Sequence, residues 1–185
     1  MLNQEYLINK SMKMLPRLFS KDKKSINAII ETPKGCAAKY NYDKKTSLFK
    51  LKKILPRGMV FPFHFGFLPH TKAEDGDPLD VLILMDESAW PGCIIKCSII
   101  GVLEAEETKD NKTVRNDRLI AVANASDQYG NIKDISELDD YLQNEMINFF
   151  NTYTNLEKKE FKILSKKNAG IAMNSIKKQM VHGHN

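Results

Sequence analysis

Strand-like segments come first in this chain, and helix-like segments follow only near its end. The strand-like segments are short runs of β-branched and aromatic residues bounded by polar turns, which is typical of β-strands. We expect strands over residues 25–33, 37–42, 47–51, 79–84, 94–103 and 118–123. One helix is expected to begin at a cap near Ser136, and a second to cover 168–180. Short strands followed by helices predict a mainly β fold, a closed β-barrel with flanking α-helices.

Four phenylalanines recur at every second position between the third and fourth of these strands. They are Phe61, Phe63, Phe65 and Phe67. Side chains at that spacing share one face of a strand, and such a stripe is more typical of a core face than of a base-stacking surface. The charged segment 104–116 is instead expected to be a loop, long enough to serve a function.

The formal net charge of +5 is concentrated at the start of the chain. In the first 25 residues, lysines and one arginine outnumber the acidic Glu5 and Asp22, so the rest of the chain is close to neutral. No organised base-reading motif accompanies the basic residues, and no apolar run approaches the roughly 20 residues of a membrane-spanning helix. We therefore expect neither nucleic acid nor a membrane as a partner.

The length of 185 residues suits a single folded domain. We expect a basic N-terminal extension (1–24), one domain (25–181) and a short tail (182–185). The three cysteines lack the density of a disulfide scaffold, which indicates a reducing compartment and favours the cytoplasm. The acid-poor, basic extension leaves organelle targeting as the alternative.

Three aspartates, Asp75, Asp77 and Asp80, lie within six residues just before an apolar run. Like charges this close repel one another unless a positive group lies among them. Mg²⁺ is such a group, because it is usually held by a few carboxylates together with water and substrate phosphate. Gly76 and Pro78 predict a tight turn that the following strand would anchor. The simpler interpretation is an acidic surface turn.

The segment 74–82, Glu-Asp-Gly-Asp-Pro-Leu-Asp-Val-Leu, resembles the signature of the soluble family I inorganic pyrophosphatases, or inorganic diphosphatases. Other segments follow in the order of that family: 30–33, 39–40, 61–67, 118–122 and 149–153. The resemblance runs from about residue 25 to about residue 180. It implies a closed five-stranded OB-like β-barrel with two helices packed outside. It also implies Mg²⁺-dependent hydrolysis of inorganic pyrophosphate to two phosphates by an in-line attack of metal-activated water. A homo-oligomer is implied as well, with a hexamer as the usual bacterial form.

The resemblance assigns roles to individual residues. Asp75 and Asp80 correspond to metal ligands, and Asp77 corresponds to the base beside the attacking water. On the substrate side the matching residues are Lys39, Lys53, Arg118 and Tyr153, while Glu31 matches an acidic residue that supports the site. Lys52 competes with Lys53 for its position under a shift of one residue.

The second metal-binding segment departs from the family pattern. When Arg118 is aligned with the lysine of the family, Asn116 falls at the position of an aspartate. Asp117 is adjacent, but on a strand its side chain would face the other way. Either Asp117 is the metal ligand or Asn116 binds through its neutral carbonyl, and Glu107 or Asp110 could provide the upstream ligand.

Further departures remove charge and phenolic groups from the expected site. Asn41 stands where the family often has glutamate, Phe61 and Phe65 stand where tyrosine is common, and Thr154 stands where a lysine often follows the late tyrosine. A site with fewer carboxylates is expected to hold fewer metal ions, or to hold them less tightly. The alternative function is therefore a degenerate protein of this fold that binds phosphate or metal with little turnover.

Overall fold

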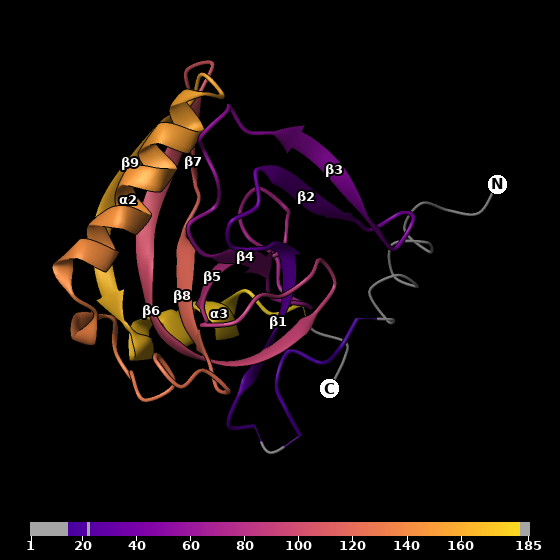
Figure 1. Ribbon diagram of the computed structural model, residues 1–185, viewed down its shortest axis with the longest axis vertical. Coiled ribbons are helices and arrows are strands. Elements are labelled where there is room, and N and C mark those ends of the chain that lie inside the picture. The colour runs from indigo at the N-terminus through magenta and orange to yellow at the C-terminus, as the bar shows by residue number, and fades with distance from the viewer. Residues whose placement is uncertain (1–14, 22, 182–185) are drawn as a thin grey trace.

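The computed structural model describes residues 15–21 and 23–181 (Figure 1). The strands and helices follow the chain as β1 (Ile26–Thr32), β2 (Ala38–Asp43), β3 (Leu48–Ile54), β4 (His64–Phe67), β5 (Asp80–Leu84), β6 (Ile94–Lys109), β7 (Lys112–Arg115), β8 (Arg118–Ala123), the 3-10 turn η1 (Ile135–Glu137), α2 (Asp140–Asn155), β9 (Glu160–Asn168) and α3 (Ala169–Lys178). The helices come late in the chain, as the sequence predicts.

Five strands form a closed ring in the order β1–β4–β5–β8–β6, and pairing of β1 with β6 completes it. Val81 of β5 lies opposite Leu119 of β8 in the parallel pair, and the other pairs of the ring are antiparallel. A side chain at Gly66 would meet the carbonyl oxygen of Ile29 at 2.0 Å, so only glycine lets β4 approach β1 this closely. The predicted closed five-stranded fold is confirmed.

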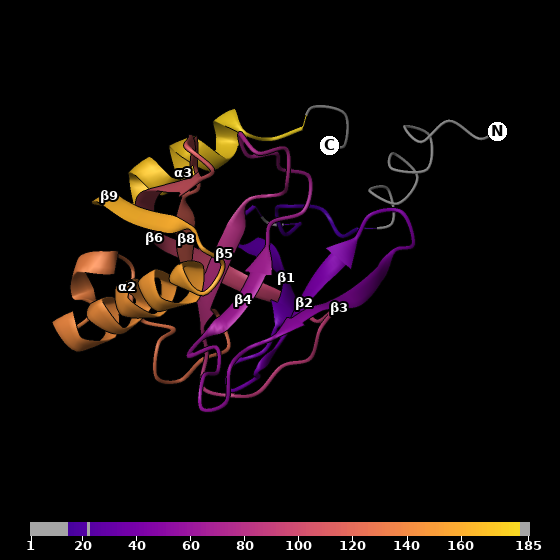
Figure 2. The ribbon, with the colours of Figure 1, turned by 90° about the horizontal axis from the view of Figure 1, so that it is seen from above.

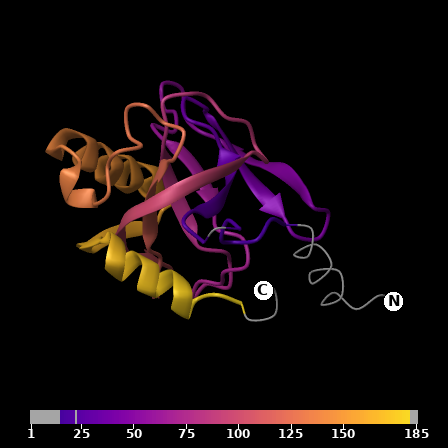
Figure 3. The same ribbon diagram turned by 90° about the horizontal axis from the view of Figure 1, so that it is seen from below.

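Both faces of the ring strands are covered, which explains why β5 and β8 are apolar throughout after their first residues, Asp80 and Arg118. Alternate residues of β5 enter different clusters: Leu82 packs with side chains of α2, whereas Val81 packs with side chains of α3. In both Figure 2 and Figure 3, α2 and the β2–β3 hairpin lie on opposite sides of the ring, and β9 lies between α2 and α3.

The phenylalanine stripe is buried, as expected for a core face, with none of the four rings more than 4% exposed. The strand itself is shorter than the stripe, because β4 begins only at His64. Within the part of the chain that the structure describes, no helix combines the length and the apolar character needed to cross a membrane.

The predicted loop over 104–116 is wrong. Strand β6 continues to Lys109, and β7 pairs with it as a hairpin. The hairpin turns at Asp110 and Asn111, whose φ angles of 50° and 60° suit the left-handed turn that joins two twisted strands. The charges that suggested a loop lie on exposed or half-buried strand positions.

Strand β9 is not among the predicted strands, although its exposed residues, such as Lys162 and Lys166, alternate with more buried ones, such as Phe161 and Ile163. The first helix begins later than predicted: Asp139 caps α2, while Ser136 lies in η1. The second helix is confirmed, and Asn168 caps it.

Part of the predicted N-terminal extension packs on the domain. Leu18 is 3% exposed within the core, and Phe19 pairs with Ile26. Residues 1–14, residue 22 and the tail 182–185 lie outside the described residues, so the division into extension, domain and tail stays a prediction.

Candidate active site

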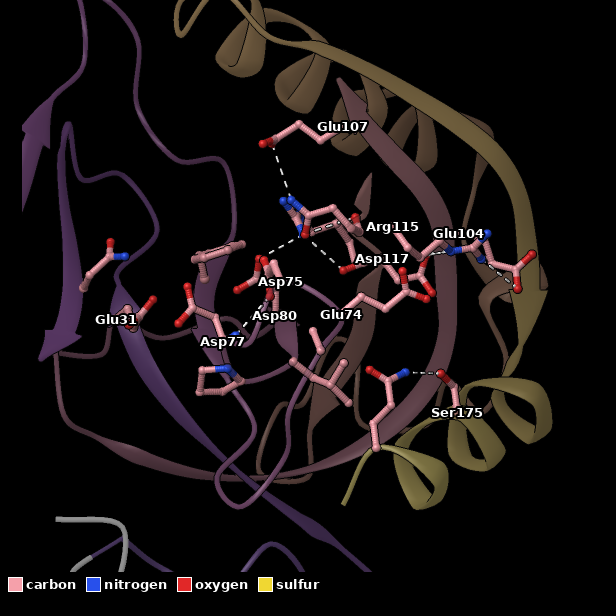
Figure 4. Close-up of a pocket in the computed structure, with 18 of the residues that line it drawn as sticks. Glu31, Glu74, Asp75, Asp77, Asp80, Glu104, Glu107, Arg115, Asp117 and Ser175 are labelled. Atoms are coloured by element: carbon pink, nitrogen blue, oxygen red, sulfur yellow. Dashed lines mark hydrogen bonds and ion pairs between the residues drawn. The ribbon is translucent and has the colours of Figure 1, made fainter. Parts of the chain in front are cut away.

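A cavity of about 670 Å³ lies between the ring, the β2–β3 hairpin, the end of α2 and α3 (Figure 4). Acidic side chains outnumber basic ones in its lining. All three aspartates of the predicted cluster line it, together with Lys39, Arg118 and Tyr153. Residues that lie far apart in the sequence are therefore brought to one site.

The acidic turn, which we define as residues 73–80, is held by its own backbone. The N–H of Asp77 donates to Oδ1 of Asp75 at 3.0 Å, and the N–H of Ala73 donates to the carbonyl of Asp77 at 2.7 Å. Gly76 has a φ of 90°, which a residue with a side chain would adopt only with strain. The carboxylates of Asp75 and Asp77 are exposed, as in an acidic surface turn, but they line a cavity that Lys39 and Arg118 also line.

Asp80 begins β5 and forms an ion pair of 2.9 Å with Arg118. Burial raises the pKa of Asp80, and the charges of Arg118 and Lys39 oppose that rise. The guanidinium of Arg118 also donates to the backbone carbonyls of Asn116 and Asp117 and lies over the ring of Phe150. Arg118 is therefore fixed in orientation with part of its charge facing the cavity.

Lys39 lies between two aromatic rings, with its Nζ 5.1 Å from the centroid of Phe65 and 5.2 Å from that of Tyr153. Burial lowers the pKa of Lys39, although the nearby Asp80 and Glu31 act in the opposite direction. Phe65 lacks the phenol that is common at its position, but its ring still provides a cation–π surface that positions the ammonium.

Lys53 forms an ion pair with Glu157, and its Nζ lies 3.8 Å from the centroid of Tyr153. The hydroxyl of Tyr153 donates to the same carboxylate at 3.4 Å. Burial acts to raise the pKa of Glu157, but the ammonium groups of Lys53 and Lys159 lower it by more, so that the pKa is about 2. Lys52, the competing candidate, is exposed and lines the cavity, whereas Lys53 supports Tyr153 from beside it.

Glu31 lies on β1 and lines the cavity with an almost fully buried side chain. Burial raises its pKa to about 7, and the backbone N–H of Tyr42, which donates to Oε1 at 2.7 Å, opposes the rise. Near it, the side-chain oxygen of Asn41 is buried with no hydrogen-bond partner among the described residues.

The candidates of the second metal-binding segment lie between β7 and β8. Oδ1 of Asn116 accepts from Arg118, and Oδ1 of Asp117 accepts from the Arg115 side chain at 2.5 Å and from the backbone of Ala105 at 3.0 Å. Glu107 lines the cavity beside Asn116 (Figure 4). Both alternatives therefore border the site, each already engaged by donors.

Asp110 is not brought to the site, because it lies in the turn of the β6–β7 hairpin. Charged side chains that the sequence reasoning missed also line the cavity, among them Glu104, Arg115, Glu157 and Lys159. An alternating strand pattern continued through 104–109 could have indicated the first of them. Nothing local to 157–159 marks the last two.

The donor set fits a divalent cation that shares its coordination with water and substrate. Among residues 15–21 and 23–181, no three His, Cys, Asp or Glu side chains form a group that could hold a metal by itself. Mg²⁺ does not require such a cage, since it commonly takes one or two carboxylates plus water and phosphate oxygen. The exposed carboxylates of the acidic turn, beside the unpartnered oxygen of Asn41, match that need.

Comparison with known proteins agrees with this geometry. A family model described as inorganic pyrophosphatase matches residues 28–183. The chain is 38% identical to the inorganic pyrophosphatase of Synechocystis over 75% of its length and 80% of the relative. It is 39% identical to that of Saccharolobus solfataricus over 71% and 76%. The crystal structure of inorganic pyrophosphatase from Thermus thermophilus superimposes with a TM-score of 0.80 at 29% identity, covering 90% of this chain and 95% of that one. The chain therefore belongs to the inorganic pyrophosphatase family.

Proposed function

We propose that this protein hydrolyses inorganic pyrophosphate to two phosphates. The observation that carries the proposal is a single cavity in which the acidic turn faces Lys39, Arg118 and Tyr153. Phosphoryl transfer needs carboxylates on one side to hold divalent cations, and cations on the other to stabilise the charge of the departing phosphate. Binding with little turnover is not favoured, because the substitutions at Asn41, Asn116 and Thr154 leave both halves of this arrangement in place.

Mg²⁺ is the proposed cofactor, with Asp75 and Asp80 as its ligands. Bound there, it would neutralise phosphate charge and lower the pKa of the attacking water. Asp117 is the proposed further ligand, with Asn116 as its alternative and Glu107 as the upstream candidate. The ion pairs of Asp117 and Glu107 would then have to exchange on loading, which is consistent with weak or incomplete occupation of this part.

Asp77 is the proposed general base. Its carboxylate is exposed in the cavity, and its nearest cation, the ammonium of Lys44, is 3.5 Å away. A carboxylate so weakly paired is free to take the proton of water as that water attacks one phosphorus in line. Lys39 and Arg118, both held by buried partners, would bind the leaving phosphate, and Tyr153 would donate to it. Lys53 would keep Tyr153 and Glu157 in place, and Glu31 would support the site through its negative charge near Lys39.

The test is phosphate release from pyrophosphate by the purified full chain, with Mg²⁺ and with excess chelator. We expect turnover that requires the metal and returns when Mg²⁺ is restored. Release at the same rate in chelator would contradict the metal part of the proposal, and no release at any Mg²⁺ concentration would contradict the activity.

Two further properties are proposed from the resemblance and the composition alone. A homo-oligomer, with a hexamer as the usual bacterial form, is testable by analytical ultracentrifugation. A cytoplasmic location would suit the three free cysteines, Cys36, Cys93 and Cys97.

A further inference from the structure

One cation of the cavity, Lys159, belongs to none of the positions that the family resemblance assigns. Its ammonium lies 2.7 Å from Glu107 and 3.0 Å from Glu157, and its side chain is 24% exposed. It lines the same cavity as Tyr153 and Arg118. A half-buried lysine between two carboxylates is either a structural link between β6 and the end of α2 or a cation held ready for an anion.

The turn after α2 places Lys159 beside Thr154. Lys158 has a φ of 56°, which reverses the chain, and the N–H of Lys159 then donates to the carbonyl of Thr154 at 3.1 Å. The Thr154 side chain is only 1% exposed, and its hydroxyl donates to the carbonyl of Phe150 at 2.7 Å. Thr154 therefore points into the helix and cannot reach the cavity, whereas Lys159 reaches it from the neighbouring backbone.

Lys159 and Tyr153 also share a carboxylate. The hydroxyl of Tyr153 donates to Oε1 of Glu157, and the ammonium of Lys159 contacts Oε2. Both groups thus lie on the same wall, and an anion that approaches Tyr153 also approaches Lys159.

We propose that Lys159 binds a phosphate group of the substrate and supplies the cation that is missing directly after Tyr153. This inference rests on the proposed function and adds a substrate contact to that site. Each carboxylate beside Lys159 has another donor: Glu157 is paired with Lys53, and Glu107 accepts from Asn116. Lys159 can therefore turn toward phosphate without leaving either carboxylate alone, which would otherwise be costly in a half-buried site.

The test compares Lys159→Gln with Lys158→Gln in the full chain. Lys158 is exposed and one residue away, so it controls for the loss of one positive charge from this turn. The measurement is calorimetric binding of methylenediphosphonate, a non-hydrolysable pyrophosphate analogue, at saturating Mg²⁺. Loss of a charged contact to phosphate should weaken binding about tenfold in Lys159→Gln, and Lys158→Gln should bind like the unchanged protein. Lys159→Arg should restore most of the affinity, which a purely structural link does not predict.

Equal affinity of Lys159→Gln and Lys158→Gln would overturn the inference, as would weakening that Lys159→Arg does not restore. Should Lys159→Gln fail to fold, the comparison moves to Lys159→Gln/Glu107→Gln against Glu107→Gln alone, which removes from both proteins the carboxylate of β6 that Lys159 contacts. The same tenfold difference is expected there, and its absence counts against the inference. The binding comparison does not depend on turnover, so it tests the role of Lys159 alone. The proposed function is tested separately, and it would be contradicted if the unchanged protein released no phosphate from pyrophosphate.

Discussion

Carboxylates on the two sides of the cavity have different neighbours. On the acidic turn, Asp75 and Asp77 are exposed, and the shortest cation contact of Asp77 is 3.5 Å. On the other side, which we call the paired wall, the carboxylates of Glu104, Glu107, Asp117 and Glu157 each contact a lysine or arginine at 3.1 Å or less. Asp75 and Asp77 are therefore free to take up cations and protons, whereas Asp80 is paired with Arg118 and each carboxylate of the paired wall has a cationic partner that holds it in place.

The difference separates chemistry from positioning. Asp75 and Asp77 repel each other with little compensation from nearby cations, and this repulsion would be relieved by the proposed metal ion. Charge pairs on the wall need no ligand, so they can keep Tyr153 oriented through Glu157 before any ligand binds. Substitutions on the turn should change turnover and metal demand, and substitutions on the wall should change stability and affinity.

The largest effect is expected from Asp77→Asn. Asparagine keeps the size of the side chain and the backbone of the turn but cannot accept a proton, so turnover should fall by about 10²–10⁴-fold with the fold unchanged. Phosphate release at saturating Mg²⁺ measures the effect, and circular dichroism checks the fold. Asp127→Asn, at an exposed position outside the cavity, is the control. Turnover by Asp77→Asn at the rate of this control would refute the assigned base.

Two carboxylates of the cavity should also differ in pH dependence: Glu31, which lies on β1 outside both sides, and Glu157 of the paired wall. Its pKa is raised from 4.5 to about 7, so between those values the folded protein retains a proton that the unfolded chain releases. The free energy of unfolding of the metal-free protein should therefore fall as the pH rises through this window, by about 3 kcal/mol from this group alone. Glu157 behaves oppositely: its pKa is lowered to about 2, so its contribution is present above pH 4.5 and is lost as the pH falls toward 2.

Glu31→Gln removes the first of these trends. The free energy of unfolding of the variant minus that of the unchanged protein should increase steadily from pH 4.5 to pH 7. Urea unfolding in the presence of chelator measures this difference. Glu160→Gln, at an exposed position on β9, is the matched control. Parallel stability curves for Glu31→Gln and the unchanged protein would show that Glu31 is ionised in the folded state.

The acidic turn could be predicted from the sequence because its contacts are local. The spacing of Asp75, Gly76 and Asp77 dictates the turn, and the apolar strand that follows anchors it. The five ring strands were predictable for a similar reason, since each shows its own alternation or buried run.

The paired wall could not be predicted in the same way. Its members come from β6, from β7 and the link to β8, and from the turn between α2 and β9. They meet because β6 pairs with both β7 and β9. This pairing is not predicted from the sequence, because residues 104–116 are expected to form a loop. The position of Lys159 is not predicted either, because β9, which follows it, is not among the predicted strands. The surroundings of Tyr153 illustrate this limit. Thr154 follows Tyr153 in the sequence, but in the cavity wall Tyr153 contacts Glu157, which in turn contacts Lys159.

Asp75→Asn should change the demand for metal more than the chemistry. The amide oxygen can still accept from the N–H of Asp77, so the turn should persist while one charged ligand is lost. The Mg²⁺ concentration for half-maximal activity should rise by about tenfold or more. Direct calorimetric titration with Mg²⁺ should show the same loss, and Asp127→Asn should match the unchanged protein in both measurements. Identical activation curves would remove Asp75 from the ligand set.

The smallest effects on stability and on substrate affinity are expected from substitutions of Lys52 and Lys53, two neighbouring lysines of β3 with different roles. Lys53 holds Glu157 and lies on the ring of Tyr153, so Lys53→Met should lower the free energy of unfolding by about 1 kcal/mol. Lys52 is exposed on the cavity, so Lys52→Met should leave stability within about 0.5 kcal/mol and raise the KM for pyrophosphate a few-fold. Chemical unfolding and steady-state kinetics on the two variants decide between them. If KM rises only in Lys53→Met, the substrate contact belongs to Lys53 and not to Lys52. A residue paired with the wall carboxylate Glu157 would then bind the substrate directly, so the two sides of the cavity would differ less than we infer.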